Sequence, residues 1–505
     1  MRELLKQLKI DYLLVNSTNE YLVEYSGLSE NARYTLTGFT GSTGDALVTK
    51  DNVYLFVDGR YHTQADKEVK PNIEVIKLQL GQKQDEEIRK LINPLKTLGI
   101  VAKKVSQARL EGFKGYKIKL LNEDPINNHT EKHITPMVEV FPAKKYKPKK
   151  TTFISNLEEV SYLTGYRDFT KDYTSKIWAK MVINGDLILF TDNKACEDYL
   201  RNFTGDLIVD KNSINAYDYA LIKKPIHKTS DIKALKSIKS DEEIESYQKA
   251  FEATDKALLA VRNYIETGEN ISEADIECRL RYEFKKQGAK SLSFKPIIAI
   301  NKNSALAHYS KNSPNIKLND GDLVLIDCGA YFEGGLATDI TRVFVKGEPF
   351  FLQKKVYTKV LKAFLNCFNA YNHFATTLSS KEVELDISGY ELDNLAHEIL
   401  DNSVEGFEFS HGLGHGIGIN VHEAPPMLNQ AELAKSKILD GMCFTIEPGL
   451  YNSEFFGIRL ENSCYKKDGK IYSFVKMGYE GKLIDYEMLT EQEKEWLKEF
   501  EILWK

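Results

Sequence analysis

The chain has 505 residues, 42% of them hydrophobic, and its 68 lysines and arginines nearly balance 73 aspartates and glutamates, for a net charge of -5. This length predicts two to four domains, and the charge offers no basic surplus for nucleic acid or an anionic membrane. The sequence lacks an apolar run of about eighteen residues and a secretory signal, so we expect no transmembrane span. Six cysteines without CxxC spacing favour reduced thiols in a cytoplasmic protein.

We predict an N-terminal α/β domain over residues 1–130. Apolar runs predict a strand at 11–16 and a two-stranded hairpin at 45–58. The pattern over 85–99 predicts a helix that ends at a glycine. A polar, proline-containing stretch between about 125 and 150 is typical of a domain boundary.

A second α/β domain is predicted over residues 131–232. Two apolar runs, 176–183 and 186–192, flank an Asn-Gly pair at Gly185, which is a strong signal for a hairpin turn. The order of elements resembles that of the first domain. We therefore expect two smaller α/β domains of similar design.

The third predicted domain covers residues 233–505. Helical periodicity predicts long helices at 230–265, 272–288, 350–371 and 391–402. Ser240 is the predicted start of the second part of the first of these, and Ser272 is the predicted cap of the second. Apolar runs predict strands at 295–301, 323–334, 336–345, 442–451 and 457–466. Long helices mixed with strands indicate an α+β fold, with the helices on one face of a curved antiparallel sheet.

The segment His411–Pro425 (HGLGHGIGINVHEAP) concentrates histidine and glycine. It contains three of the chain's ten histidines, His411, His415 and His422. Imidazole binds metals and carries protons near neutral pH, whereas the repeated glycines disfavour a helix. We expect a turn that leads into a strand over 417–423.

Acidic residues before and after this segment complete a candidate metal site. Carboxylates inside or at the ends of apolar strands are costly unless they are paired or bind a cation. The candidates are Asp327, Asp339, His415, Glu447 and Glu461. Together they carry a charge of about -4, which two divalent ions would balance. Oxygen-rich sites with one imidazole suit Mn²⁺, Co²⁺, Fe²⁺ or Zn²⁺.

Ion pairs are an alternative explanation for single members of this set. Asp339 could pair with Arg342, and Glu461 could pair with Arg459. Ion pairing is a reasonable explanation for one of these residues alone but a poor one for all five together. We therefore favour the metal site.

Four motifs resemble the metal-ligand motifs of the pita-bread metallopeptidases, a family that includes aminopeptidase P, prolidase and methionine aminopeptidase. They are LIDCGAYFEGGLATDITR (325–342), HGLGHGIGINVHEAP (411–425), FTIEPGLY (444–451) and GIRLEN (457–462). The resemblance implies a C-terminal pita-bread catalytic domain whose five ligands are Asp327, Asp339, His415, Glu447 and Glu461. It also implies two divalent metal ions, Mn²⁺ first, with Zn²⁺ or Co²⁺ as alternatives.

The resemblance further implies a mechanism in which two ions share a bridging water and make hydroxide available. Glu447 would take a proton from the attacking water and pass it to the leaving nitrogen. His308 and His422 would hydrogen-bond the scissile carbonyl and its oxyanion. His411 matches the third active-site histidine of the family, and Arg459 would orient a neighbouring carboxylate.

Segments outside the catalytic domain extend the resemblance over nearly the whole chain. Residues 38–65 resemble the first domain of Xaa-Pro aminopeptidases, 156–169 the second, and 482–500 the C-terminal extension of the three-domain cytosolic form. This likeness implies an aminopeptidase that releases the first residue from peptides with proline in second position. It also implies a homodimer.

Two departures from the family pattern keep other functions open. Asp327 and Asp339 are twelve residues apart, one more than expected, and we place the additional residue as a bulge in the turn 333–335. The stretch between His415 and His422 is short, as in prolidases. The alternatives are a prolidase that cleaves Xaa-Pro dipeptides and a non-catalytic binding protein that keeps the fold.

Overall fold

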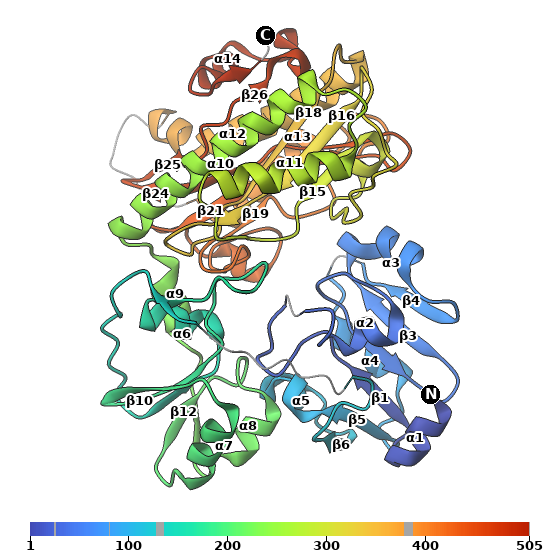
Figure 1. Cartoon of the computed structure of the whole chain (residues 1–505), viewed down its shortest axis with the longest axis vertical. Helices are drawn as coiled ribbons and strands as arrows, with labels where there is room; N and C mark the ends of the chain where they lie inside the picture. The colour runs from blue at the N-terminus through green and yellow to red at the C-terminus, as the bar shows by residue number, and fades with distance from the viewer. Residues whose placement is uncertain (25–26, 80, 128–135, 378–386, 504–505) are drawn as a thin grey trace. The chain divides into compact units, whose positions relative to one another are not determined.

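The computed structural model describes residues 1–24, 27–79, 81–127, 136–377 and 387–503 (Figure 1). The chain forms two compact units, the first made of 1–166 and 176–231 and the second of 167–175 and 232–505. The boundary expected near residue 130 lies outside the described residues, and the division of the first unit into two domains stays a prediction. No helix in the described part of the chain is long and apolar enough to cross a membrane.

The first unit begins with a six-stranded sheet of order β4-β3-β2-β1-β5-β6. Its strands are β1 (Tyr12–Val15), β2 (Ala46–Val48), β3 (Val53–Val57), β4 (Ile73–Lys77), β5 (Thr97–Val101) and β6 (Lys117–Leu121). Its helices are α1 (Arg2–Leu8), α2 (Ala32–Thr37), α3 (His62–Glu68), α4 (Gln84–Leu91) and α5 (Gln107–Gly112). Strands β2 and β3 pair antiparallel, which confirms the predicted hairpin.

The predicted helix over 85–99 is wrong in its second half. Helix α4 ends at Leu91, and β5 begins six residues later, parallel to β1. Pro94 falls in between and cannot donate a helical hydrogen bond. Gly99 lies inside the strand, where a Cβ atom would come within 2.6 Å of the Ile10 side chain. The glycine therefore serves close packing and does not end a helix.

The first unit also contains a five-stranded sheet of order β11-β10-β8-β12-β13. Its strands are β8 (Thr152–Ile154), β10 (Lys180–Asn184), β11 (Asp186–Phe190), β12 (Leu207–Val209) and β13 (Pro225–His227), with helices α6 (Leu157–Thr164), α7 (Asn193–Asn202) and α8 (Ala216–Leu221). Two short strands, β7 (Val138–Glu139) and β9 (Tyr166–Arg167), pair with each other in a separate two-stranded sheet. Strands β10 and β11 pair antiparallel about Gly185, whose φ of 77° confirms the predicted turn.

Long helices dominate the second unit. They are α9 (Ile232–Ser237), α10 (Asp241–Thr267), α11 (Glu273–Lys286), α12 (Phe351–Thr377), α13 (Gly389–Leu400) and α14 (Glu491–Leu497). Ser240 and Ser272 cap α10 and α11, each through a reciprocal capping box. The helical pattern predicted over 230–265 forms two helices, and the second begins after Ser240, which confirms the predicted start of its second part.

The second unit also contains short strands, most of them paired antiparallel. One sheet has the order β15-β16-β18, made of Ile297–Ile300, Leu323–Cys328 and Ile340–Val345. Another has the order β21-β24-β25, made of Cys443–Ile446, Asn462–Lys467 and Lys470–Ser473. The remaining pairs are β22 (Gly449–Tyr451) with β23 (Gly457–Arg459), β14 (Ser291–Leu292) with β17 (Ala330–Tyr331), β19 (Gly414–His415) with β20 (Met427–Leu428), and the parallel pair β26 (Tyr479–Glu480) with β27 (Ile502–Leu503).

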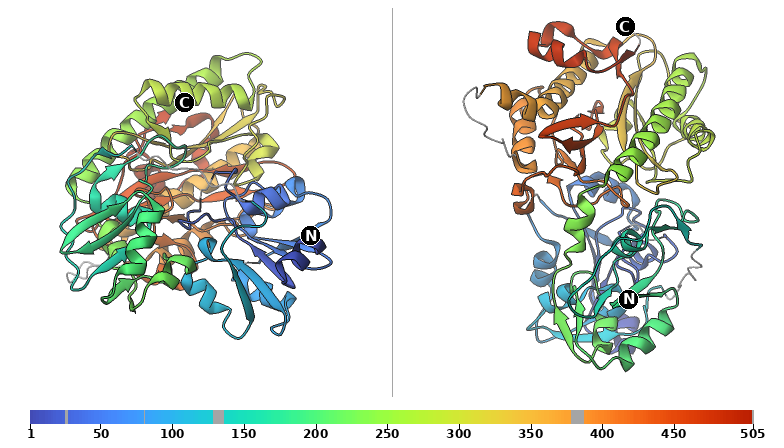
Figure 2. Two further views of the ribbon diagram at one scale, coloured as in Figure 1. Left: turned by 60° about the horizontal axis from the view of Figure 1, so that its bottom comes forward. Right: turned by 90° about the vertical axis from the view of Figure 1, so that its left-hand side faces the viewer.

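Helices cover both faces of these strands, whereas we expected helices on one face. Leu325 and Val343 belong to the core that also contains residues of α12 and α13. Phe344, the next residue along β18, lies beneath the Arg262 guanidinium of α10 at 5.6 Å. Side chains alternate between the two faces of a strand. The right view of Figure 2 accordingly shows α10 and α13 on opposite sides of the strands.

Candidate metal centre and active site

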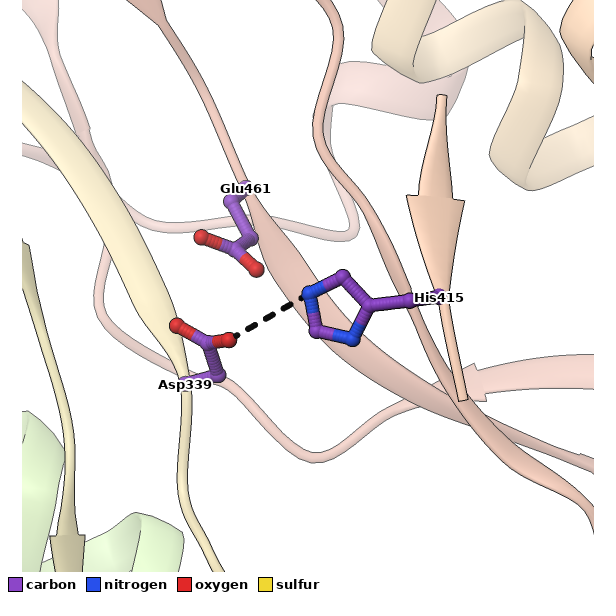
Figure 3. A group of neighbouring side chains, drawn as sticks. All are labelled: Asp339, His415 and Glu461. Carbon is purple, nitrogen blue, oxygen red and sulfur yellow. Dashed lines mark ion pairs between the residues drawn. The ribbon is translucent and has the colours of Figure 1, made fainter. Parts of the chain in front are cut away.

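Three of the predicted ligands point toward one another in the second unit (Figure 3). Ligand atoms of Asp339, His415 and Glu461 all lie within 4.8 Å of one another. His415 Nε2 is 3.6 Å from Asp339 Oδ2. Asp339 directly precedes β18, His415 ends β19, and Glu461 lies between β23 and β24. Segments far apart in the sequence thus supply one group of ligand atoms.

Glu447 and Asp327 join the same group. Glu447 Oε1 lies 3.4 Å from His415 Nε2. Asp327 is on β16, and its charge acts on Asp339, Glu447 and Glu461. The structure therefore brings all five predicted ligands into one cluster.

The cluster is electrostatically costly without a cation. Burial, reinforced by neighbouring carboxylates, raises the pKa of Asp339 and Glu461 well above the ordinary range. Burial also raises the pKa of Asp327, and it raises the pKa of Glu447 to about 8. Each shift means that the protein alone disfavours the carboxylate form. A bound cation would reverse that preference.

The donor atoms suit divalent cations. Asp327 Oδ1 and Glu461 Oε1 are buried, and in the described part of the chain neither has a hydrogen-bond partner. Buried polar atoms normally have one. His415 Nδ1 lies 3.1 Å from the Gly416 carbonyl oxygen. A proton on Nδ1 would donate to that oxygen and leave the Nε2 lone pair directed at the carboxylates, as in metal-binding histidines.

A hydrogen-bonded chain leads away from Asp327. Arg459 Nη2 lies 2.5 Å from Asp327 Oδ2, and Arg459 Nη1 donates to the Tyr451 hydroxyl at 2.8 Å. Tyr451 Oη is 2.7 Å from His411 Nε2, while His411 Nδ1 is 2.8 Å from the Gly412 carbonyl. Both ring nitrogens of His411 are thus engaged, and burial lowers the pKa of this histidine to about 3.

Arg342 does not form the ion pair considered as an alternative for Asp339. It donates to Asn462 Oδ1 and to the carbonyl oxygens of Thr341, Glu461, Met477 and Gly478. The side chain of Arg459 reaches Asp327 in place of Glu461. Ion pairing therefore leaves most of the buried acidic charge without a counterion.

Sequence reasoning missed three polar residues beside the ligands, namely Thr341, Thr445 and Tyr451. Thr341 Oγ1 donates to Glu461 Oε2 at 2.7 Å and accepts from Arg459 Nε at 3.2 Å. Thr445 Oγ1 is 3.4 Å from Glu447 Oε1. Each threonine is two residues from a predicted ligand. The alternation of side chains along a strand could have identified both.

His422 lies beside His415, but the strand predicted over 417–423 is wrong. The two imidazole rings meet edge to face, with centroids 4.3 Å apart. Residues 417–425 are irregular. Ile419 N donates to Glu423 Oε2 at 2.9 Å, and a Cβ atom on Gly418 would come within 1.9 Å of Glu423 Oε1. A side-chain carboxylate thus takes the place of a strand partner.

Glu423 is itself held by two buried lysines. Lys236 Nζ and Lys239 Nζ lie 3.1 and 3.0 Å from its carboxylate oxygens, and all three side chains are at most 3% exposed. Although burial opposes ionisation, the two ammonium groups hold the pKa of Glu423 at about 2. This ion triplet anchors the backbone next to His422.

The turn at 333–335, which we predicted to contain the additional residue, closes tightly. Gly335 N donates to the Phe332 carbonyl at 2.9 Å, and Gly335 has a φ of 61°. Strand pairing then places Ile340 opposite Cys328, so that Asp339 reaches the cluster despite the twelve-residue spacing. The placement of the additional residue relative to the family pattern stays a prediction.

His308 is half-buried in the segment that follows the 3-10 helix η3 (Asn301–Ala305). Helix η3, directly before this segment, contacts β23, because Gly457 N donates to Ser304 Oγ at 2.9 Å. The structure thus joins the His308 segment to the strand that carries Arg459. The substrate-binding role of His308 stays a prediction.

Two parts of the chain match known protein families. Residues 245–467 match Metallopeptidase family M24, and residues 1–123 match the Creatinase/Prolidase N-terminal domain. The fold and the cluster therefore define a metallopeptidase with a C-terminal pita-bread domain. Residues 245–467 thus form a domain of the M24 type, and residues 1–123 form an N-terminal domain of the creatinase type.

Several similar proteins are named as aminopeptidases that act on Xaa-Pro peptides. The chain is 26% identical to the probable Xaa-Pro aminopeptidase P of Coprinopsis cinerea, covering 99% of this chain and 93% of that protein. It is 25% identical to Xaa-Pro aminopeptidase 1 of Dictyostelium discoideum, covering 99% and 91%. A crystal structure of X-prolyl aminopeptidase from Caenorhabditis elegans, described as a cytosolic enzyme with a di-nuclear active site, shares the fold. Its TM-score is 0.83 at 20% identity, covering 97% of this chain and 90% of that chain.

Proposed function

We propose that the protein is a metal-dependent aminopeptidase that releases the first residue from peptides with proline in second position. The convergence of Asp339, His415 and Glu461 carries the metal-dependent part of this proposal. The preference for proline is supported by the relatives named Xaa-Pro aminopeptidase, which align over 99% of the chain.

Two divalent ions would be held by Asp327, Asp339, His415, Glu447 and Glu461. Asp327 Oδ1 and Glu461 Oε1, which have no hydrogen-bond partner in the described part of the chain, would be available as donor atoms for these ions. When bound, such ions polarise a carbonyl and lower the pKa of water toward neutrality. The oxygen-rich donor set suits Mn²⁺ first, and Zn²⁺ or Co²⁺ as alternatives.

Other side chains would transfer protons and hydrogen-bond the substrate carbonyl. Glu447 would take a proton from the attacking water and deliver it to the leaving nitrogen. His422, which lies beside His415, and His308 would hydrogen-bond the scissile carbonyl as negative charge develops on its oxygen. Arg459 would orient Asp327, and His411 would orient Tyr451, since both of its nitrogens are engaged.

Three wider features belong to the same proposal. The two sheets of the first unit would represent two smaller α/β domains of similar design. The protein would act as a cytoplasmic enzyme, in keeping with its six free cysteines. It would form a homodimer, as the family resemblance implies.

A peptide series tests the proposed function. Purified protein with added Mn²⁺ is incubated with an Xaa-Pro-Xaa-Xaa tetrapeptide, the matched Xaa-Ala-Xaa-Xaa tetrapeptide and an Xaa-Pro dipeptide. The proposal expects release of the first residue from the proline tetrapeptide, much faster than from the alanine control. Cleavage of the dipeptide alone would identify a prolidase. No cleavage of any peptide would indicate a binding protein that keeps the fold.

A further inference from the structure

Glu273, the first residue of α11, is a buried carboxylate surrounded by neutral donors. The residue is 0% exposed, and in the described part of the chain no basic side chain forms an ion pair with it. Its Oε1 accepts hydrogen bonds from Ile300 N at 2.9 Å and Asn303 Nδ2 at 2.8 Å. Its Oε2 accepts from Tyr309 Oη at 2.7 Å and Ser313 N at 2.8 Å. These four bonds use the acceptor capacity of an ionised carboxylate.

All four donors belong to residues 300–313, the segment that carries His308. Apart from η3 this segment has little regular structure, and Asn301 and Asn312 have positive φ values of 45° and 37°. Its buried N–H groups therefore need acceptors other than a strand or helix. Glu273 supplies two of those acceptors and also fixes Tyr309, the neighbour of His308.

The same helix holds the far end of the segment. Asn312 Nδ2 donates to Glu277 Oε2 at 2.7 Å, one helical turn after Glu273. On its other side the segment packs against β23, where a Cβ atom on Gly457 would lie 2.2 Å from the Ser304 carbonyl oxygen. The segment is thus clamped between α11 and a strand that leads to the metal cluster.

We infer that Glu273 is the positioning residue for His308: its carboxylate organises residues 300–313 so that the imidazole is held for the substrate. The inference rests on the proposed function, in which His308 contacts the substrate. Glutamine has nearly the same shape as glutamate, but its amide nitrogen would face two of the four donors. The substitution Glu273→Gln should therefore disturb the segment while leaving the metal ligands in place.

A double-mutant cycle tests the link between the two residues. We expect Glu273→Gln to lower kcat at least tenfold with unchanged metal content. In the His308→Ala background the same substitution should cause no further loss, because its effect is exerted through His308. Full activity of Glu273→Gln, or losses that multiply in the double variant, would overturn the inference. The milder Tyr309→Phe, with Tyr282→Phe as an exposed control on α11, should lower kcat in the same direction.

Amide hydrogen exchange gives a readout that does not depend on activity. In Glu273→Gln the amides of 300–313 should exchange at least tenfold faster than in the unaltered protein, while those of β16 keep their protection. Unchanged exchange in 300–313 would overturn the inference. If the unaltered protein failed to cleave proline peptides, the proposed function would be overturned instead. The exchange experiment does not depend on activity, so the two failures can be distinguished.

Discussion

Arg459 Nη1 donates a hydrogen bond of 2.8 Å to the hydroxyl oxygen of Tyr451, and both side chains are buried. This bond connects the His411 ring on one side with Asp327 on the other. The orientation of one predicted metal ligand therefore depends on an aromatic residue that is not a ligand. Contacts of this kind commonly tune both metal affinity and activity.

Tyr451→Phe should weaken the candidate metal site without unfolding the protein. The change removes the acceptor for Arg459 and the donor for His411, and leaves the ring in place. We expect metal affinity and kcat/KM to fall by about tenfold to a hundredfold, measured by metal titration and peptide cleavage. The exposed Tyr486→Phe is the matched control. Equal effects of the two substitutions would contradict the role of the hydrogen-bonded chain.

Asp339→Asn should separate metal binding from folding. In the metal-free protein the substitution removes a buried carboxylate whose pKa is raised by burial and by its acidic neighbours. We expect the melting temperature of the metal-free variant to equal or exceed that of the unaltered protein. Activity should fall at least about a hundredfold, more than for an outer contact of the site. Asp468→Asn, in an exposed turn, is the control. Retained turnover in Asp339→Asn would contradict the ligand assignment.

The sequence predicts much of this site because strand alternation and apolar context are local signals. Acidic residues within apolar strands indicated Asp327, Asp339 and Glu447, and the structure places all three together. The capping residues Ser240 and Ser272 likewise predict where α10 and α11 begin. These features depend on a few neighbouring residues, so a single sequence suffices to find them.

Features that depend on distant partners were missed. The strand predicted over 417–423 is absent because Glu423, which is held by the distant Lys236 and Lys239, supplies an acceptor to Ile419 N. The local pattern predicts a helix end at Gly99, yet this glycine permits close packing against Ile10. The contacts of Glu273 with residues 300–313 also have no local signature. Only the folded chain brings such groups together.

Glu423→Gln should be strongly destabilising. It would leave Lys236 and Lys239 buried without their counterion, a change that typically costs about 3–5 kcal/mol. Denaturant unfolding measures this loss. The control is Glu432→Gln, which breaks an exposed pair with Lys435 and should cost under about 1 kcal/mol. Equal losses would show that the buried triplet does not anchor the loop.

A companion variant separates stability from positioning. Glu423→Leu combined with Lys236→Met and Lys239→Met removes all three charges, so most of the lost stability should return. The activity of this triple variant should nevertheless be well below that of the unaltered protein, because Ile419 N would lack its acceptor beside His422. Full recovery of activity would contradict the positioning role of Glu423.

Asp255 should make stability depend on pH. Burial raises the pKa of its carboxyl to about 6 in the folded protein, from an ordinary value of 3.8. The folded state therefore holds this proton more tightly, so the stabilising contribution is complete below about pH 4 and is lost as the pH rises through 6. Asp255→Asn lacks this titration. Its free energy of unfolding, relative to the unaltered protein, should increase by about 2 kcal/mol between pH 4 and pH 7.

The control for this dependence lies on the same helix. Glu252 is exposed and paired with Lys256, so the free energy of unfolding of Glu252→Gln, relative to the unaltered protein, should stay nearly constant over the same pH range. Urea unfolding of metal-free protein at several pH values provides the comparison. A flat difference for Asp255→Asn would contradict the assignment of a buried, protonated carboxyl.

Metal stoichiometry is the most direct test of a site that binds two divalent ions and depends on them for activity. Metal-free protein is dialysed against Mn²⁺, and bound metal and proline-peptide cleavage are measured together, with and without chelator. We expect two ions per chain and activity that rises as they bind. In Asp339→Asn we expect metal binding and activity both to be lost. A protein that binds no divalent ion, or that cleaves the peptide at full rate in chelator, would contradict it.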